Sequence, residues 1–197
     1  GCAYASVYNY SLMNEVTILS QKIGSISCSA NINDKYFVTG GTDCSISIYE
    51  FPFMNLISTL SVQSLPVICI AGEISLDLLV SIDGKHNVYC SSIERKRLLF
   101  TFSIDCQYKS LHSLLVLKNS LIVISSSFPE NKSGVISFYD TLGNNLGNIY
   151  VYGHVIKMIP LYPNDYSIYI VVTLETKKII IIDATTLSII SKDITFN

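Results

Sequence analysis

The feature that most constrains the fold is an internal repeat with a period of about 41 residues. Residues 7–14, VYNYSLMN, align with residues 48–55, IYEFPFMN, and the same shift places residues 26–28, ISC, on residues 67–69, VIC. Periods of about 20 to 50 residues are typical of solenoids and propellers, and four short strands in about 40 to 45 residues form one β-propeller blade. The repeat therefore predicts a row of similar four-stranded modules.

The composition favours an all-β chain. It contains 28 Ile, 14 Val and 11 Thr but only 5 Ala, and β-branched side chains suit a pleated sheet better than a helix. Hydrophobic residues make up 49% of the chain and charged residues 14%, so the chain can bury a core and is not disordered.

Period-2 alternation between turn residues predicts where the strands lie. The expected strands are residues 5–9, 16–20, 25–30, 36–39, 44–49, 56–60, 67–71, 78–81, 87–90, 98–102, 111–117, 121–126, 135–139, 148–152, 156–161, 167–173, 178–183 and 187–191. We expect one partial β-propeller of about four and a half four-stranded blades over residues 1–197. Its predicted parts are the end of a blade at 1–24 and blades at 25–61, 65–103, 110–152 and 153–192.

The expected blade number predicts a fragment of a larger ring. A ring of about seven blades at this repeat length would need about 290 residues. We expect the other blades to come from a longer polypeptide or from a second chain. A closed four-bladed ring that uses the amino-terminal strands as a clasp is the less favoured alternative.

The expected third strands end in a hydrophobic residue followed by a polar one, at Tyr49-Glu50, Cys90-Ser91, Tyr139-Asp140 and Ile182-Asp183. Residues 38–50, VTGGTDCSISIYE, resemble the WD repeat, whose third strand ends in an aromatic-acidic pair after a Gly-x-x-Asp turn, and Gly153-His154 resembles its Gly-His pair. The resemblance implies that the acidic turn residue and the histidine lock the strands through buried hydrogen bonds. The chain departs from the family because it has no Trp, and because the acidic turn residue and the histidine of the repeat are each recognisable only once, as Asp43 and His154. We therefore expect the diverged blades to depend on apolar packing.

A narrower resemblance covers roughly residues 25–190. It rests on residues 77–81, DLLVS, on residues 88–99, VYCSSIERKRLL, on a longer connection at 128–134, and on residues 135–147, VISFYDTLGNNLG. This order of features resembles the carboxy-terminal propeller of BEACH-domain proteins, the neurobeachin group. The resemblance implies a non-catalytic protein-protein interaction scaffold that acts in vesicle trafficking, cytoplasmic and peripheral to membranes through its parent protein.

Three histidines, His86, His112 and His154, are the first candidates for chemistry. In its Gly-His turn, His154 is better explained by a structural hydrogen bond than by a metal or acid-base role. His86 lies in the turn at residues 83–87, for which we favour a solvated hairpin over a ligand site, and His112 begins an apolar strand as an edge residue. None of the common hydrolase, zinc-protease or nucleotide-binding motifs occurs, so we assign no catalytic, cofactor-binding or metal-binding residue and expect no cofactor and no enzymatic activity.

The carboxylates of the turns also favour structural roles. Turn chemistry explains Asp43 and Asp83, and Asp140 and Asp183 are interpreted as strand ends before functional groups.

The remaining charges and aromatic residues are interpreted in the same way. Residues 94–97, ERKR, are expected to form a solvated hairpin, because their three cations are fewer than the about 4 to 8 that mark a lipid-binding patch; a small basic patch for lipid or an acidic partner is the alternative. Lys177-Lys178 is expected to keep a strand edge soluble. Tyr8, Tyr49 and Tyr139 are placed by the repeat and assigned to structure.

The charge balance and the cysteines narrow the class of partner. With 13 Lys and Arg against 15 Asp and Glu, the chain lacks the basic excess that nucleic acid requires. Its apolar runs are strand-sized, far below the about 18 residues of a membrane-spanning helix. Six cysteines without a Cys-x-x-Cys pair favour reduced thiols in a cytosolic protein over a secreted disulfide framework.

We therefore expect other proteins to be bound by loops on one face of the propeller. The alternatives are a WD-repeat subunit of a nuclear or ribosome-assembly complex, and a propeller-based hydrolase or lyase. The enzyme alternative would require His, Asp and Glu to converge at one place.

Overall fold

The computed structural model describes residues 4–9, 14–20, 24–104, 110–128 and 133–195, with side chains described for 24–104, 110–128 and 133–191. Within these residues the chain has 18 strands and one three-residue 3₁₀ helix, η1 (Ile74–Leu76). No helix in this part of the chain is long and apolar enough to span a membrane. The prediction of an all-β chain is confirmed.

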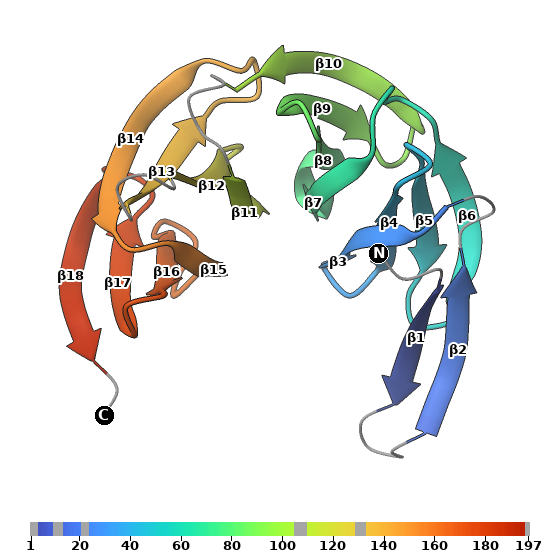
Figure 1. Ribbon diagram of the computed structural model, residues 1–197, viewed down its shortest axis with the longest axis horizontal. Helices are drawn as coiled ribbons and strands as arrows, with labels where there is room; N and C mark the ends of the chain where they lie inside the picture. The colour runs from blue at the N-terminus through green and yellow to red at the C-terminus, as the bar shows by residue number, and fades with distance from the viewer. Residues whose placement is uncertain (1–3, 10–13, 21–23, 105–109, 129–132, 196–197) are drawn as a thin grey trace. The chain divides into compact units, whose positions relative to one another are not determined.

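The chain divides into two compact units, Gly1–Ile104 and Asp105–Asn197. The first unit, blue to green in Figure 1, contains one two-stranded and two four-stranded antiparallel sheets. Its strands are β1 (Tyr4–Asn9), β2 (Asn14–Ser20), β3 (Ile26–Ile32), β4 (Tyr36–Gly41), β5 (Ile46–Glu50), β6 (Asn55–Leu60), β7 (Val67–Glu73), β8 (Leu78–Asp83), β9 (Asn87–Ser92) and β10 (Arg97–Ser103).

The second unit contains two further four-stranded antiparallel sheets. Its strands are β11 (Ser110–Val116), β12 (Ile122–Phe128), β13 (Ser133–Tyr139), β14 (Asn145–Tyr152), β15 (Val155–Leu161), β16 (Tyr169–Leu174), β17 (Lys178–Asp183) and β18 (Ser188–Thr195). The longer connection expected at 128–134 includes residues 129–132, which lie outside the described part of the chain.

Each four-stranded sheet is a meander in which strands adjacent in sequence are adjacent in space. Within the first unit β3 and β4 of one sheet pack beside β7 of the next, and within the second unit β11 packs beside β15. In Figure 1 the last strands of the sheets, β6 and β10 in one unit and β14 and β18 in the other, lie on the outer side of their own unit. Four-stranded meanders that meet through their first strands are β-propeller blades.

The structure thus has four blades, and the expected total of about four and a half was wrong. The predicted strands near the amino terminus do form, as β1 and β2, but they pair only with each other among the described residues. A sheet of two strands lacks the central, doubly paired strands that are buried in a blade. It therefore counts as a hairpin and adds no part of a fifth blade.

One backbone irregularity recurs in every blade. The pairing of the first and second strands shifts by one residue near the start of the first strand, between Ile26 and Cys28, Val67 and Cys69, Leu111 and Ser113, and Val155 and Lys157. The extra residue at each shift is Ser27, Ile68, His112 or Ile156. A β-bulge of this kind redirects the side chain of the extra residue. The recurrence is a structural counterpart of the sequence repeat, and one of its four members is a histidine.

Apolar side chains pack between the two blades of each unit. One cluster of buried apolar residues in the first unit contains Ile32, Val38, Ile46, Ile48, Leu60, Val67, Ile70, Leu79 and Ile93. One such cluster in the second unit contains Leu117, Val123, Ile136, Phe138, Val151, Val155, Met158, Ile168, Ile170, Val172, Leu174, Ile180, Ile182 and Ala184. The central strands β8 and β12 are buried along almost their whole length, whereas the outer strand β14 leaves alternate side chains in solvent.

Two glycines mark the entry to a first strand. Gly24 (φ 92°) precedes β3 and Gly153 (φ 102°) precedes β15, and both lie in the left-handed region that favours glycine. A Cβ at Gly24 would lie 2.7 Å from Thr42 Oγ1, and one at Gly153 would lie 2.8 Å from Thr176 Cγ2. Each entry turn is thus pressed against the turn between the second and third strands of its own blade.

Candidate functional site

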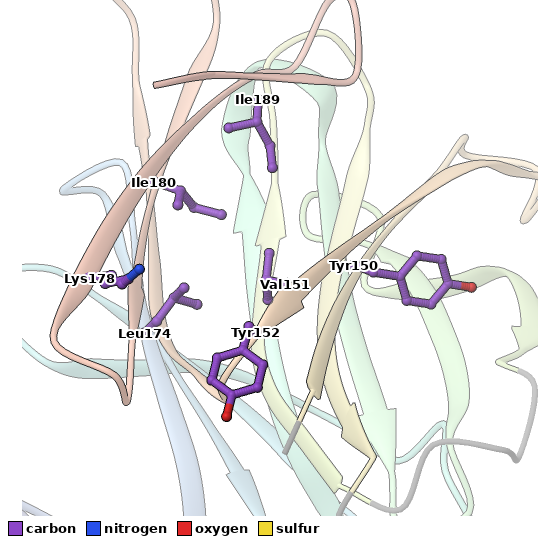
Figure 2. Close-up of a pocket in the computed structure, with 7 residues that line it drawn as sticks. All are labelled: Tyr150, Val151, Tyr152, Leu174, Lys178, Ile180 and Ile189. Atoms are coloured by element: carbon purple, nitrogen blue, oxygen red, sulfur yellow. The ribbon is translucent and has the colours of Figure 1, made fainter. Parts of the chain in front are cut away.

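A pocket of about 230 Å³ lies in the second unit, between the outer strand of one blade and three strands of the next. Its lining residues are Tyr150, Val151 and Tyr152 of β14, Leu174 of β16, Lys178 and Ile180 of β17, and Ile189 of β18. Figure 2 shows Val151 among Leu174, Ile180 and Tyr152, while the Tyr150 ring points away from the other labelled side chains.

Strand alternation gives this pocket an apolar floor and an exposed aromatic rim. Val151 points into the core of the unit together with Leu174 and Ile180, and all three are buried. The residues on either side of Val151 face the opposite way, so Tyr150 is 64% exposed and Tyr152 75% exposed. Tyrosines that offer a large apolar surface and a polar hydroxyl to solvent are enriched in protein interfaces.

A second group of residues brings two histidines together in the same unit. His112 is the extra residue of the bulge in β11, and its ring centroid lies 5.8 Å from that of His154, in the connection between β14 and β15. His112 Nε2 is 2.7 Å from the Ser127 hydroxyl of β12. His154 Nε2 is 3.9 Å from Glu175 Oε2, in the turn between β16 and β17, and the Glu175 amide donates to the His154 carbonyl oxygen at 2.9 Å.

The environment of this pair disfavours positive charge on His112. Burial lowers the pKa of His112, the neighbouring His154 lowers it further, and Glu175 opposes both effects only in part. His154 Nδ1 is buried and has no hydrogen-bond partner among the described residues. The group is therefore a tight pair of imidazoles with one carboxylate beside it.

The chain matches no family model and no curated protein.

The expected lock around His154 forms only in part. Its Gly-His turn does contact the turn between the second and third strands, as the resemblance implied, through the backbone hydrogen bond from Glu175. The ring, however, reaches Glu175 at 3.9 Å, which is an ion-pair distance and too long for a hydrogen bond. In the first blade the equivalent backbone bond runs from the Thr42 amide to the Ser25 carbonyl oxygen at 2.9 Å, with serine in the place of the histidine.

The turn interpretation of Asp43 and Asp83 is confirmed. Asp43 Oδ1 accepts from the Ser45 amide and hydroxyl. Asp83 has no exposed surface and accepts from Lys85, Asn87 and Tyr89. His86 lies in the same turn with a positive φ of 64°, as expected for a hairpin.

The strand-end interpretation of Asp140 and Asp183 is also confirmed. Asp140 directly follows β13 and accepts from the amides of Leu142 and Asn144, and Asp183 ends β17 and accepts from the Thr185 amide. Hydrogen bonds with Asn144 are the main reason why the pKa of Asp140 is lowered, and the Thr185 amide is the main reason for Asp183.

The charged and aromatic candidates fall mostly where the sequence placed them. Residues 94–97 are exposed; residues 94–96 lie in the turn from β9 to β10 and Arg97 begins β10, so the hairpin interpretation holds. Tyr49 and Tyr139 are buried, whereas the side chain of Tyr8 lies outside the described part. Lys178 does not protect a sheet edge, because β17 is an interior strand; Lys178 lines the pocket.

The described cysteines are free thiols, and burial raises the pKa of three of them. Burial raises the pKa of Cys28 and of Cys90 to about 12 and that of Cys69 to about 11. Cys2 and Cys106 lie outside the described residues. In the described part of the chain no group of three or more His, Cys, Asp and Glu side chains could hold a metal ion.

Sequence reasoning missed both sites in the second unit. It did not single out Glu175, Ser127 or the pocket residues Val151 and Leu174. A single sequence shows that such positions alternate on strands, but it does not show which strand of one blade faces which strand of the next. The one available signal was the acidic Glu175 in the turn between two predicted strands.

Proposed function

We propose that this chain is a non-catalytic interaction module that binds an extended peptide segment of a protein partner at the pocket between β14 and β16–β18. The observation that carries the proposal is the pocket whose floor is formed by buried apolar side chains and whose rim includes the exposed Tyr152. Tyrosines beside a well-packed pocket are typical of interaction hot spots.

The size of the pocket favours a peptide over a small molecule. At about 230 Å³ it is smaller than the about 300 to 1,000 Å³ typical of cofactor and drug-sized ligand sites, and one or two apolar side chains would occupy it.

The adjacent backbone offers a second element of recognition. In the described sheet β14 is the outermost strand and pairs only with β13, so its free edge can hydrogen-bond an added strand. A peptide extended along β14 would place alternate side chains towards the pocket. Binding by loops on one face of the propeller, which the sequence analysis expects, is the alternative location.

The surroundings of the histidines support the non-catalytic part of the proposal. The bond between Ser127 and His112 resembles that of a nucleophile with its base, but Ser127 is only 2% exposed. A hydroxyl this buried is not accessible to a substrate in the folded chain. The hydrolase alternative also called for several carboxylates beside the histidine, and Glu175 is the carboxylate that acts on His112.

We further propose a WD-repeat relationship, supported by the glycine entry turns at Gly24 and Gly153 and by the contact of the Gly153-His154 turn with Glu175. A BEACH-type identity, a cytoplasmic location and a role in vesicle trafficking rest on the sequence pattern of residues 25–190 alone. A subunit of a nuclear or ribosome-assembly complex is the alternative within the same fold.

The test is selection of peptides from a random display library on the 197-residue chain, followed by affinity measurements with the selected peptides. We expect the selected peptides to share one large apolar side chain. Tyr152→Ala should weaken their binding about thirtyfold, the loss of about 2 kcal/mol typical of a hot-spot aromatic residue.

The matched control is Tyr166→Ala, which removes the same side chain from a site 92% exposed and outside the pocket. It should leave the affinity unchanged. If the library yields no common peptide, or if both substitutions weaken binding equally, the pocket is not the binding site.

A further inference from the structure

The histidine pair joins the two blades of the second unit. His112 belongs to β11, the first strand of one blade, while His154 immediately precedes β15, the first strand of the next, and Glu175 lies in a turn of that second blade. Strands β11 and β15 lie side by side. The rings therefore meet where the two blades come together.

The charges around the pair make it sensitive to protonation. Two neighbouring side chains affect the charge on His112: His154 disfavours the protonated form of His112, and Glu175 favours it. The other element in contact, β12, contributes the neutral hydroxyl of Ser127. Glu175 is exposed, so solvent weakens its attraction for a cation on His112, whose ring centroid lies 5.8 Å from that of His154.

We propose that His112, His154 and Glu175 form an acid-sensitive contact that holds the two blades of the second unit together while His112 is neutral and loosens them when His112 is protonated. The contact does not depend on the peptide-binding proposal.

The direction of the effect follows from linkage. The pKa of His112 is lowered in the folded chain, so the unfolded chain binds more protons as the pH falls below the ordinary value of 6.5. Stability from this group is complete above that pH and is lost as the pH falls from 6.5 to the lowered pKa. The contact thus weakens in the mildly acidic range.

The test is amide hydrogen exchange of the full chain at pH 7.5 and pH 5.5, corrected for the intrinsic pH dependence of exchange. We expect local opening of β11 and β15 to increase at pH 5.5. In His112→Gln, which keeps a side-chain group able to hydrogen-bond Ser127, the rise should be clearly smaller than in the wild type, because the imidazole whose pKa is lowered in the folded chain is gone.

A second variant and a control make the outcome decisive. Glu175→Gln removes the carboxylate from an exposed position, so it should fold normally and should increase the acid-induced opening. His86→Gln, in a turn of the other unit, should keep the wild-type pH dependence. Equal acid-induced opening in wild type, H112Q and E175Q would overturn the proposal, as would no increase in the wild type.

Discussion

Replacing Asp83 tests how far a single carboxylate stabilises the turn between β8 and β9. Its Oδ1 accepts from the Lys85 amide at 2.8 Å and from the Asn87 amide at 3.0 Å. Its Oδ2 accepts from Asn87 Nδ2 at 2.9 Å and from the Tyr89 hydroxyl at 3.1 Å. The side chain has no exposed surface, so water cannot replace the carboxylate as acceptor without a rearrangement of the turn.

The expected losses follow from which of these four bonds each variant retains. Asp83→Asn keeps the two backbone bonds to Oδ1 but places an NH₂ group against Asn87 Nδ2, so it should lower the free energy of unfolding by about 1.5 to 3 kcal/mol, the value of one lost charge-assisted bond. Asp83→Ala leaves four donors without their acceptor. The Lys85 amide, in an exposed part of the turn, can recover a bond to water, so we expect a total loss of about 3 to 5 kcal/mol.

Urea unfolding followed by far-ultraviolet circular dichroism measures the total effect, since the chain has no Trp to report by fluorescence. Because the two units need not unfold together, exchange of the Lys85 and Asn87 amides supplies the local measurement. Faster exchange of these two amides in D83A than in D83N is the expected order.

The pH dependence gives an independent readout. Burial raises the pKa of Asp83, but the hydrogen bonds from Asn87, Lys85 and Tyr89 together outweigh it, so the pKa is held below the ordinary 3.8. The wild type should therefore keep this stability above pH 4 and lose it as the pH falls through the lowered pKa, whereas D83N should lack this loss.

The control for Asp83 is Asp140→Asn. Asp140 makes the same kind of bonds to Leu142 and Asn144, but in a turn open to solvent, so the loss should be smaller. Equal stability of D83N and D140N, or a D83A chain within about 0.5 kcal/mol of the wild type, would refute the reasoning.

Two further predictions concern packing and thiol chemistry. Gly134→Ala should lower the free energy of unfolding, measured with urea, by about 1 to 3 kcal/mol, because its Cβ would lie 2.8 Å from the Gly153 carbonyl oxygen. Gly84→Ala should leave the free energy of unfolding unchanged, because a Cβ there would have nothing within 4 Å. Equal effects of the two substitutions would contradict the geometry. Cys28, Cys69 and Cys90 should resist iodoacetamide at pH 8 in the native chain and react in urea, since burial raises the pKa of each thiol. Mass analysis of peptides from the labelled chain measures the reaction at each cysteine. Equal labelling in the native chain and in urea would show that these thiols are accessible.

The strands could be predicted from sequence because their signals are local. Alternation and turn residues placed a strand at or overlapping every described strand, and the prediction failed only in counting the amino-terminal pair as part of a blade. Pairing of β1 with β2 is itself local; whether a further sheet continues from them depends on long-range contacts that no periodicity encodes.

The sites could not be predicted because they depend on packing between blades. His112 and His154 are 42 residues apart in the sequence, and each was assigned a separate local role. His154 does lie in the connection between two strands, as its predicted turn role required. Their contact requires the bulge that turns His112 out of the regular alternation of β11. A one-residue bulge changes the face of a side chain, and alternation alone assigns the wrong one.

The four bulges suggest how the repeat accommodates different functions. In the first unit the Ser27 hydroxyl contacts the carbonyl oxygens of Gly40 and Val67, and Val67 begins the first strand of the next blade. In the second unit His112, at the equivalent bulge, contacts His154 at the entry to the next blade. The backbone irregularity is the same, but a hydroxyl fixes the blade junction at any pH, whereas an imidazole makes it depend on protonation. The bulge position is therefore where a single substitution, such as His112→Ser, should convert an acid-sensitive blade junction into a permanent one.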